Sequence, residues 1–189
     1  MENKLSFSNK EDWRDWLKEN YNKESYVWLL LYKKKYRKKE MTLEDAVEEA
    51  MCFGWIDGKL RRVDSESFIL RFSPRKTKSV WSQINKKRAE RLIKSGRMTA
   101  AGLATILEAK KNGLWENAYT NKTKEAIPED LKEALMKEKQ AWENFHGFAN
   151  SYRNMYVAWV NNAKTDVTRM KRIKKIVEQS LLNKKLISL

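Results

Sequence analysis

The sequence predicts an α+β fold, with a small antiparallel sheet and packed helices followed by a helical C-terminal region. A short apolar run at 26–32 is typical of a buried strand. Alternating segments at 56–63 and 67–73 flank a polar turn at 64–66, which predicts a hairpin. From residue 80 onward, apolar residues recur at helical spacing. Strands followed by a run of helices are typical of the α+β class.

The first predicted element is a helix at 11–21, where four large side chains share one face: Trp13, Trp16, Leu17 and Tyr21. The apolar strand follows at 25–33, and its continuous hydrophobicity predicts burial on both faces. A basic stretch at 33–39 is predicted to be a solvated loop rather than a nucleic-acid clamp, because isolated charge runs are usually exposed.

A second helix is predicted to begin after Thr42, because Asp45 stands three residues later in a variant of the capping box. Gly54 fits the position just beyond the end of this helix. The hairpin comes next, and Pro74 ends its second strand because proline has no backbone N–H for the strand ladder.

The remaining helices are predicted at 80–95, 100–112, 129–138, 139–148, 152–163 and 170–181. The polar stretch 119–127 interrupts this series and is the best candidate for a linker. We therefore expect an α+β domain at 1–118, a linker at 119–127 and a helical C-terminal region at 128–189.

The composition is that of a folded and strongly basic protein. Its 189 residues are 41% hydrophobic and include 8 Trp. With 40 Lys and Arg against 25 Asp and Glu, the formal net charge is +15, which attracts polyanions such as nucleic acid. A general richness in lysine explains the same charge without a dedicated surface, so both interpretations stay open.

Several classes of site are disfavoured by the residues that the chain lacks. With Cys52 as its single cysteine and His146 as its single histidine, the chain predicts neither an internal disulfide nor a structural zinc site. We expect no cofactor and no metal, and we expect Cys52 to be buried and inert and His146 to be structural or exposed. The polar start of the chain and the shortness of its longest apolar run predict a cytoplasmic protein without a transmembrane segment.

Several unusual strings stand in order along the chain: Phe53–Gly58 (FGWIDG), Arg71–Lys76 (RFSPRK), Ser79–Asn85 (SVWSQIN), and farther on Ile127–Leu131 and Ser151–Arg153. This succession resembles the bacterial YdeI/OmpD-associated family, whose members are labelled bacteriocin-protection proteins. The resemblance covers nearly the whole chain, and it implies a soluble protective protein without assigning catalytic residues. At Lys76 the resemblance implies an arginine, so the charge is kept but the planar fork is lost.

The hairpin and the helix after it are predicted to form an anion site. Asp57 is expected near the open end of the hairpin, roughly opposite Ser73, with Arg75 close by to form a charge-assisted pair. Ser79 is expected to cap the following helix, whose N-terminal N–H groups and dipole favour an anion.

On that helix, Asn85 and Arg88 interrupt the apolar stripe of Trp81 and Leu92, and buried polar groups need partners. The predicted binding residues are Trp55, Asp57, Arg71, Arg75, Lys76, Trp81, Ser82, Asn85 and Arg88, with an indole as a flat stacking wall. An alternative is an internal ion pair between Asp57 and Arg88 that locks the hairpin to the helix.

The sequence thus favours a protein of stress-protection or bacteriocin-protection type that binds an anionic ligand or a protein partner at the hairpin–helix junction. One alternative is a nucleic-acid-binding protein that acts non-specifically through its basic surface. Another is an enzyme acting on a phosphorylated or otherwise anionic small molecule. The sequence leans away from an enzyme, because no metal cluster, P-loop or nucleophile motif accompanies the candidate residues.

Overall fold

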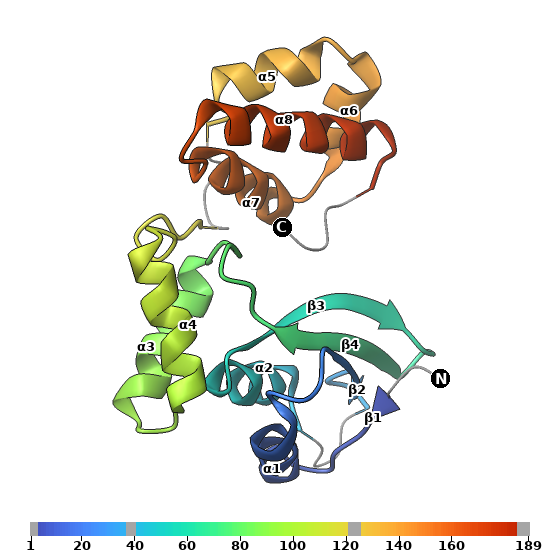
Figure 1. The fold of residues 1–189 in the computed structure, drawn as a ribbon. Coiled ribbons are helices and arrows are strands. Elements are labelled where there is room, and N and C mark those ends of the chain that lie inside the picture. The colour runs from blue at the N-terminus through green and yellow to red at the C-terminus, as the bar shows by residue number, and fades with distance from the viewer. Residues whose placement is uncertain (1–3, 37–40, 121–125, 185–189) are drawn as a thin grey trace. The chain divides into compact units, whose positions relative to one another are not determined.

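The computed structural model describes residues 4–36, 41–120 and 126–184. The chain forms two compact units. The first unit comprises residues 1–77 and 87–108, and the second comprises 78–86 and 109–189. The predicted α+β class with a helical C-terminal region is confirmed (Figure 1).

The first unit contains the sheet, whose strands lie in the order β1-β2-β4-β3. These strands are β1 (Lys4–Leu5), β2 (Val27–Tyr32), β3 (Trp55–Arg62) and β4 (Ser67–Pro74). β3 and β4 form the predicted hairpin, β4 pairs antiparallel with β2, and β1 pairs parallel with β2. The sequence did not predict β1, because two residues are too short to show an alternating pattern.

Helices α1 (Lys10–Asn20) and α2 (Leu43–Cys52) pack on this sheet (Figure 1). The Trp13 ring of α1 lies 5.6 Å from the Phe72 ring of β4, so α1 covers the sheet face that carries Phe72. The predicted capping box of α2 is confirmed by reciprocal hydrogen bonds between Thr42 and Asp45. Gly54 follows the helix with φ +75°, a conformation that favours glycine.

Helix α3 (Gln83–Lys94) begins three residues later than the sequence predicts. The predicted cap at Ser79 is wrong, because Ser82 caps the helix by accepting a hydrogen bond from the backbone N–H of Asn85 at 3.2 Å. Trp81 therefore precedes the helix. Helix α4 (Ala100–Lys111) follows and ends at Gly113, as expected.

The second unit is dominated by four helices: α5 (Glu129–Met136), α6 (Lys139–Gly147), α7 (Asn150–Asn161) and α8 (Asp166–Leu181). Their buried core centres on Leu131, Leu135, Phe145, Tyr156 and Ile176. Between α5 and α8, Arg169 donates two hydrogen bonds to Asp130 at 2.5 and 2.8 Å. Across the described ranges, no helix combines the length and apolarity required to cross a membrane.

The compact units group residues 78–86 and 109–118 with the C-terminal helices, whereas the sequence analysis placed them in the N-terminal domain. The reason is a short parallel bridge between Ser82 and Tyr119. The backbone N–H of Gln83 donates to the carbonyl oxygen of Tyr119 at 2.8 Å, and the N–H of Tyr119 donates to the carbonyl oxygen of Trp81 at 2.9 Å. The Trp81 and Trp115 rings also meet edge-on at 5.0 Å. Most of the predicted linker, 121–125, lies outside the described residues.

Candidate functional site

The candidate site begins with a β-bulge in β3 that sets the direction of Asp57. If the register of the pairs from Arg62 to Leu60 continued along β3, Asp57 would lie opposite Ser73, as the sequence analysis expected. The register shifts between Leu60 and Asp57, and Asp57 pairs with Phe72. A one-residue shift moves a side chain to the other face of a sheet. The bulge therefore turns Asp57 toward the face that α1 covers.

Burial dominates the electrostatics of this carboxyl group. It raises the pKa of Asp57 above the ordinary value, while a hydrogen bond to backbone and the charges of Arg88 and Arg75 lower it in part. Two guanidinium groups from different elements thus act on one buried carboxyl group. Three of the predicted binding residues therefore interact electrostatically within the first unit: Asp57, Arg75 and Arg88.

Arg75 follows the end of β4, and its position is fixed by the backbone. Its N–H donates to the carbonyl oxygen of Gly54 at 2.9 Å, which ties the start of the connection after β4 to the turn before β3. The Arg75 side chain is half-buried, with its Nε atom inside the protein. Lys76, the next residue, is exposed. A half-buried guanidinium group thus precedes an ammonium group that reaches the solvent.

Arg88 lies on α3 and has a second acidic neighbour. Its Nη2 atom is 3.9 Å from Oε1 of Glu44 at the start of α2. The Arg88 side chain is 17% exposed, whereas that of Glu44 is 63% exposed. Arg88 therefore has an exposed carboxylate, Glu44, on one side and also lowers the pKa of the Asp57 carboxyl group.

Two further predicted residues of the first unit lie apart from this cluster. Trp55 is 2% exposed, and its Nε1 donates to the carbonyl oxygen of Tyr21 at 2.9 Å. Its ring meets that of Trp16 edge-on within the core. Arg71 points to the opposite sheet face, where its guanidinium lies 4.5 Å from the centre of the Tyr26 ring.

The other three predicted residues belong to the second unit: Trp81, Ser82 and Asn85. Trp81 is 2% exposed and packs on Trp115, and Ser82 caps α3. Their positions are therefore explained within that unit by a ring contact and a helix cap.

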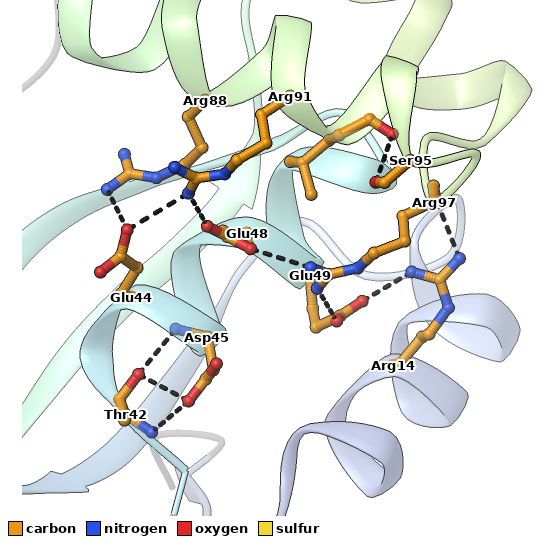
Figure 2. Close-up of polar contacts among 11 residues, drawn as sticks. Arg14, Thr42, Glu44, Asp45, Glu48, Glu49, Arg88, Arg91, Ser95 and Arg97 are labelled. Carbon is orange, nitrogen blue, oxygen red and sulfur yellow. Dashed lines mark hydrogen bonds and ion pairs between the residues drawn. The ribbon is translucent and has the colours of Figure 1, made fainter.

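A larger charged cluster of the first unit was missed by the sequence analysis. Glu48 and Glu49 of α2 are 7% and 2% exposed. Arg14 donates to Glu49 at 2.6 Å, and Arg97 donates to both carboxylates, at 3.0 Å for Glu48. Arg91 pairs with Glu48 and, at 3.3 Å, with Glu44 (Figure 2).

This cluster joins α2 to α1, to α3 and to the segment before α4 (Figure 2). Every residue of α2 from Ala46 to Cys52 is buried, so both faces of the helix are covered. The sequence analysis predicted this helix but assigned no partners to Glu48 and Glu49. The available signal was the pair Glu48–Glu49 in a helix rich in Ala, Val and Met, but its arginine partners lie more than 30 residues away.

Cysteine and histidine are the residue types most often used in metal binding and redox chemistry, and the chain has one of each. Cys52 is buried, and burial, more than any other cause, raises the pKa of its thiol. His146 is exposed, and its Nδ1 lies 3.1 Å from the carbonyl oxygen of Trp142. Within the described part of the chain, no group of three or more His, Cys, Asp or Glu side chains is arranged to hold a metal ion.

Fold and site together define an α+β unit with arginine–carboxylate clusters, followed by a unit of four helices. The chain belongs to the family described as a domain of unknown function, DUF8412, whose model matches residues 5–105. Residues 126–183 match the family described as bacteriocin-protection, YdeI or OmpD-associated, which confirms the resemblance seen in the sequence over that region. No curated protein and no solved structure matches the chain.

Proposed function

We propose that the protein binds a small anionic ligand, bearing a phosphate or a carboxylate, through Arg75 and Arg88 at the junction of the hairpin with α3. The observation that carries the proposal is that one buried carboxyl group, Asp57, interacts with two guanidinium groups. Burial disfavours the charged form of this carboxyl group, while the two guanidinium groups favour negative charge beside them. We propose that an anion from solvent binds next to these two guanidinium groups.

The identity of the two cations supports this chemistry. Guanidinium groups present several N–H donors in a planar fork, which matches phosphate and carboxylate oxygens. Asp57 interacts electrostatically with both cations, and exposed Lys76, next to Arg75 in the chain, adds a positive charge. The roles are therefore binding by Arg75 and Arg88, orientation by Asp57, and attraction by Lys76.

The biological setting is proposed from the family of the C-terminal region. That family is described as bacteriocin-protection, and we propose that the protein serves a protective role by binding its ligand. We propose a cytoplasmic location, since phosphorylated metabolites are abundant there.

The proposal is tested by thermal unfolding with inorganic phosphate, pyrophosphate or citrate, in the wild type and in Arg75→Ala. Lys94→Ala is the matched control, because it removes one positive charge from an exposed position at the far end of α3. A ligand at 100 times its Kd stabilises the folded state by about 2.7 kcal/mol. We expect an anion to raise the Tm of the wild type and of Lys94→Ala, but not that of Arg75→Ala.

Arg88→Ala separates ligand binding from a purely architectural role. If the site binds an anion, this variant keeps a cooperative unfolding transition and loses the anion-dependent rise in Tm. If Arg88 only locks the hairpin to α3, its truncation removes one of the two positive charges beside Asp57, and breaking such a buried pair costs up to roughly 3–5 kcal/mol. A collapse of stability in Arg88→Ala, with no anion effect on the wild type, would reject the proposal.

A further inference from the structure

The sheet face opposite α1 carries two arginines whose guanidinium groups lie over aromatic rings. The guanidinium carbon of Arg61 is 4.3 Å from the centre of the Trp28 ring. That of Arg71 is 4.5 Å from the centre of the Tyr26 ring. Such cation–π contacts hold a guanidinium in place beside the ring. This set of four residues, Tyr26, Trp28, Arg61 and Arg71, is called the arginine–aromatic face below.

The strand register places the four residues on one side of the sheet. Trp28 of β2 pairs with Arg71 of β4, and Arg61 of β3 pairs with Ile69 of β4. Phe72, the contact of α1, alternates with Arg71 and therefore points to the other side. The Arg61 side chain thus reaches across β4 to Trp28. Ile69 and Trp28 are 4% and 3% exposed.

The charges of the strands are strongly one-sided. Among the described strand residues, the basic ones are Lys4, Lys59, Arg61, Arg62 and Arg71. The strands contain one carboxylate, Asp57, and the bulge turns it to the face of Phe72. Lys4 pairs with Trp28 and so adds a cation to the arginine–aromatic face. The partner that complements this face is therefore a polyanion.

The aromatic component selects among polyanions. Trp28 and Ile69 are covered, so the face offers little apolar surface for insertion into a lipid bilayer. It offers guanidinium planes instead, on which unpaired nucleobases stack, with charged groups for the phosphates. Tyr26 and Trp28 are two residues apart and stand roughly 7 Å from each other along the chain. Two successive stacking positions are thus presented.

From this combination we infer that the arginine–aromatic face binds single-stranded nucleic acid, with bases stacking on Arg61 and Arg71 and phosphates contacting the flanking lysines. The inference is independent of the anion site proposed above, which lies on the other side of the sheet. The inference assigns nucleic-acid binding to the arginine–aromatic face, whereas the sequence analysis considered only non-specific binding by the whole basic surface.

The test is fluorescence anisotropy with a labelled oligothymidylate and with a duplex of the same length, at low and moderate salt. The decisive variant is Arg61→Lys combined with Arg71→Lys, because it keeps every charge and removes the guanidinium planes. The charge control is Lys171→Gln combined with Lys174→Gln, on the exposed side of α8.

We expect the double lysine variant to lose about tenfold or more in affinity for the single strand, since an ammonium group gives a base no plane on which to stack. The α8 control should stay within about threefold of the wild type, with a salt dependence set by the remaining phosphate contacts. Thermal unfolding of each variant verifies that it is folded.

Equal losses in the double lysine variant and the α8 control would overturn the inference in favour of distributed charge. A preference for the duplex, or for anionic lipid vesicles over the oligothymidylate, would overturn it as well. If oligothymidylate binding is lost on Arg61 and Arg71 substitution while the anion-dependent rise in Tm persists, the two sites are separate.

Discussion

Asp57 pairs with Phe72 and not with Ser73, because β3 contains one extra residue between Asp57 and Leu60. This single insertion decides on which face of the sheet the carboxyl group lies. Without it, Asp57 would join the arginine–aromatic face and oppose the charges there. With it, the carboxyl group lies where Arg88 and Arg75 act on it, at the proposed anion site.

The burial of Asp57 predicts a specific pH dependence of stability. The unfolded residue ionises near pH 4, whereas the raised pKa of the folded residue means that the native state holds its proton to higher pH. The contribution of Asp57 is therefore most favourable below its unfolded pKa and is lost as the pH rises through its folded pKa. In urea unfolding, the stability difference between the wild type and Asp57→Asn should fall as pH rises over this interval. A difference that grows with pH would contradict the assignment.

The buried acids of α2 predict a large cost for neutralising one of them. Glu49 is 2% exposed and accepts hydrogen bonds from Arg14 and Arg97, so Glu49→Gln leaves two guanidinium groups without their main counter-charge. We expect a loss of roughly 3 kcal/mol in the free energy of unfolding, measured by denaturant titration. Glu90→Gln, at an exposed position of α3, should change it by less than about 0.5 kcal/mol. Similar losses in both variants would mean that the cluster does not stabilise the unit.

Gly102 predicts an effect of volume rather than charge. A Cβ atom there would lie 2.4 Å from the carbonyl oxygen of Cys52 and 2.8 Å from that of Met51, so α4 approaches the end of α2 too closely for a side chain. Gly102→Ala should lower the stability by about 1–3 kcal/mol or more, in spite of the better helix propensity of alanine. The control is Gly147→Ala, where a Cβ atom meets nothing within 4 Å. Thermal unfolding measures the effect. A Tm of Gly102→Ala above that of the wild type would contradict this packing.

The thiol of Cys52 is expected to be unreactive in the native protein. It is buried, and burial raises its pKa, so little thiolate is present and reagents do not reach it. With a disulfide reagent at about pH 8, labelling should require denaturant and follow global unfolding. Rapid stoichiometric labelling without denaturant would show that the end of α2 opens locally.

Much of the fold follows from local patterns in the sequence. The capping box at Thr42, the positive φ at Gly54, the turn at 64–66 and the stop at Pro74 are each set by residues close in the chain. Local chemistry of this kind is readable without tertiary information. The start of α3 was misplaced because Ser79 and Ser82 are both possible caps, and the Ser82–Tyr119 bridge favours the second.

The site depends on contacts that no local pattern contains. The sequence around Gly58 and Lys59 has no strong alternation of polar and apolar residues that would reveal a bulge. The bulge nevertheless decides on which face of the sheet Asp57 lies. The partners of Glu48 and Glu49 come from three separate segments, and the pairing of Arg61 with Trp28 requires the strand order β2-β4-β3. Such pairings are fixed only when the chain has folded.

The central claim, an anion site at Arg75 and Arg88, is tested most directly by isothermal titration calorimetry with pyrophosphate at low ionic strength. The account predicts saturable binding to the wild type and to Lys94→Ala. It predicts that Arg75→Ala binds pyrophosphate about tenfold or more weakly than the wild type, because the variant loses at least one charge-assisted hydrogen bond. Equal affinity in Arg75→Ala and Lys94→Ala, or no heat of binding in the wild type, would contradict it.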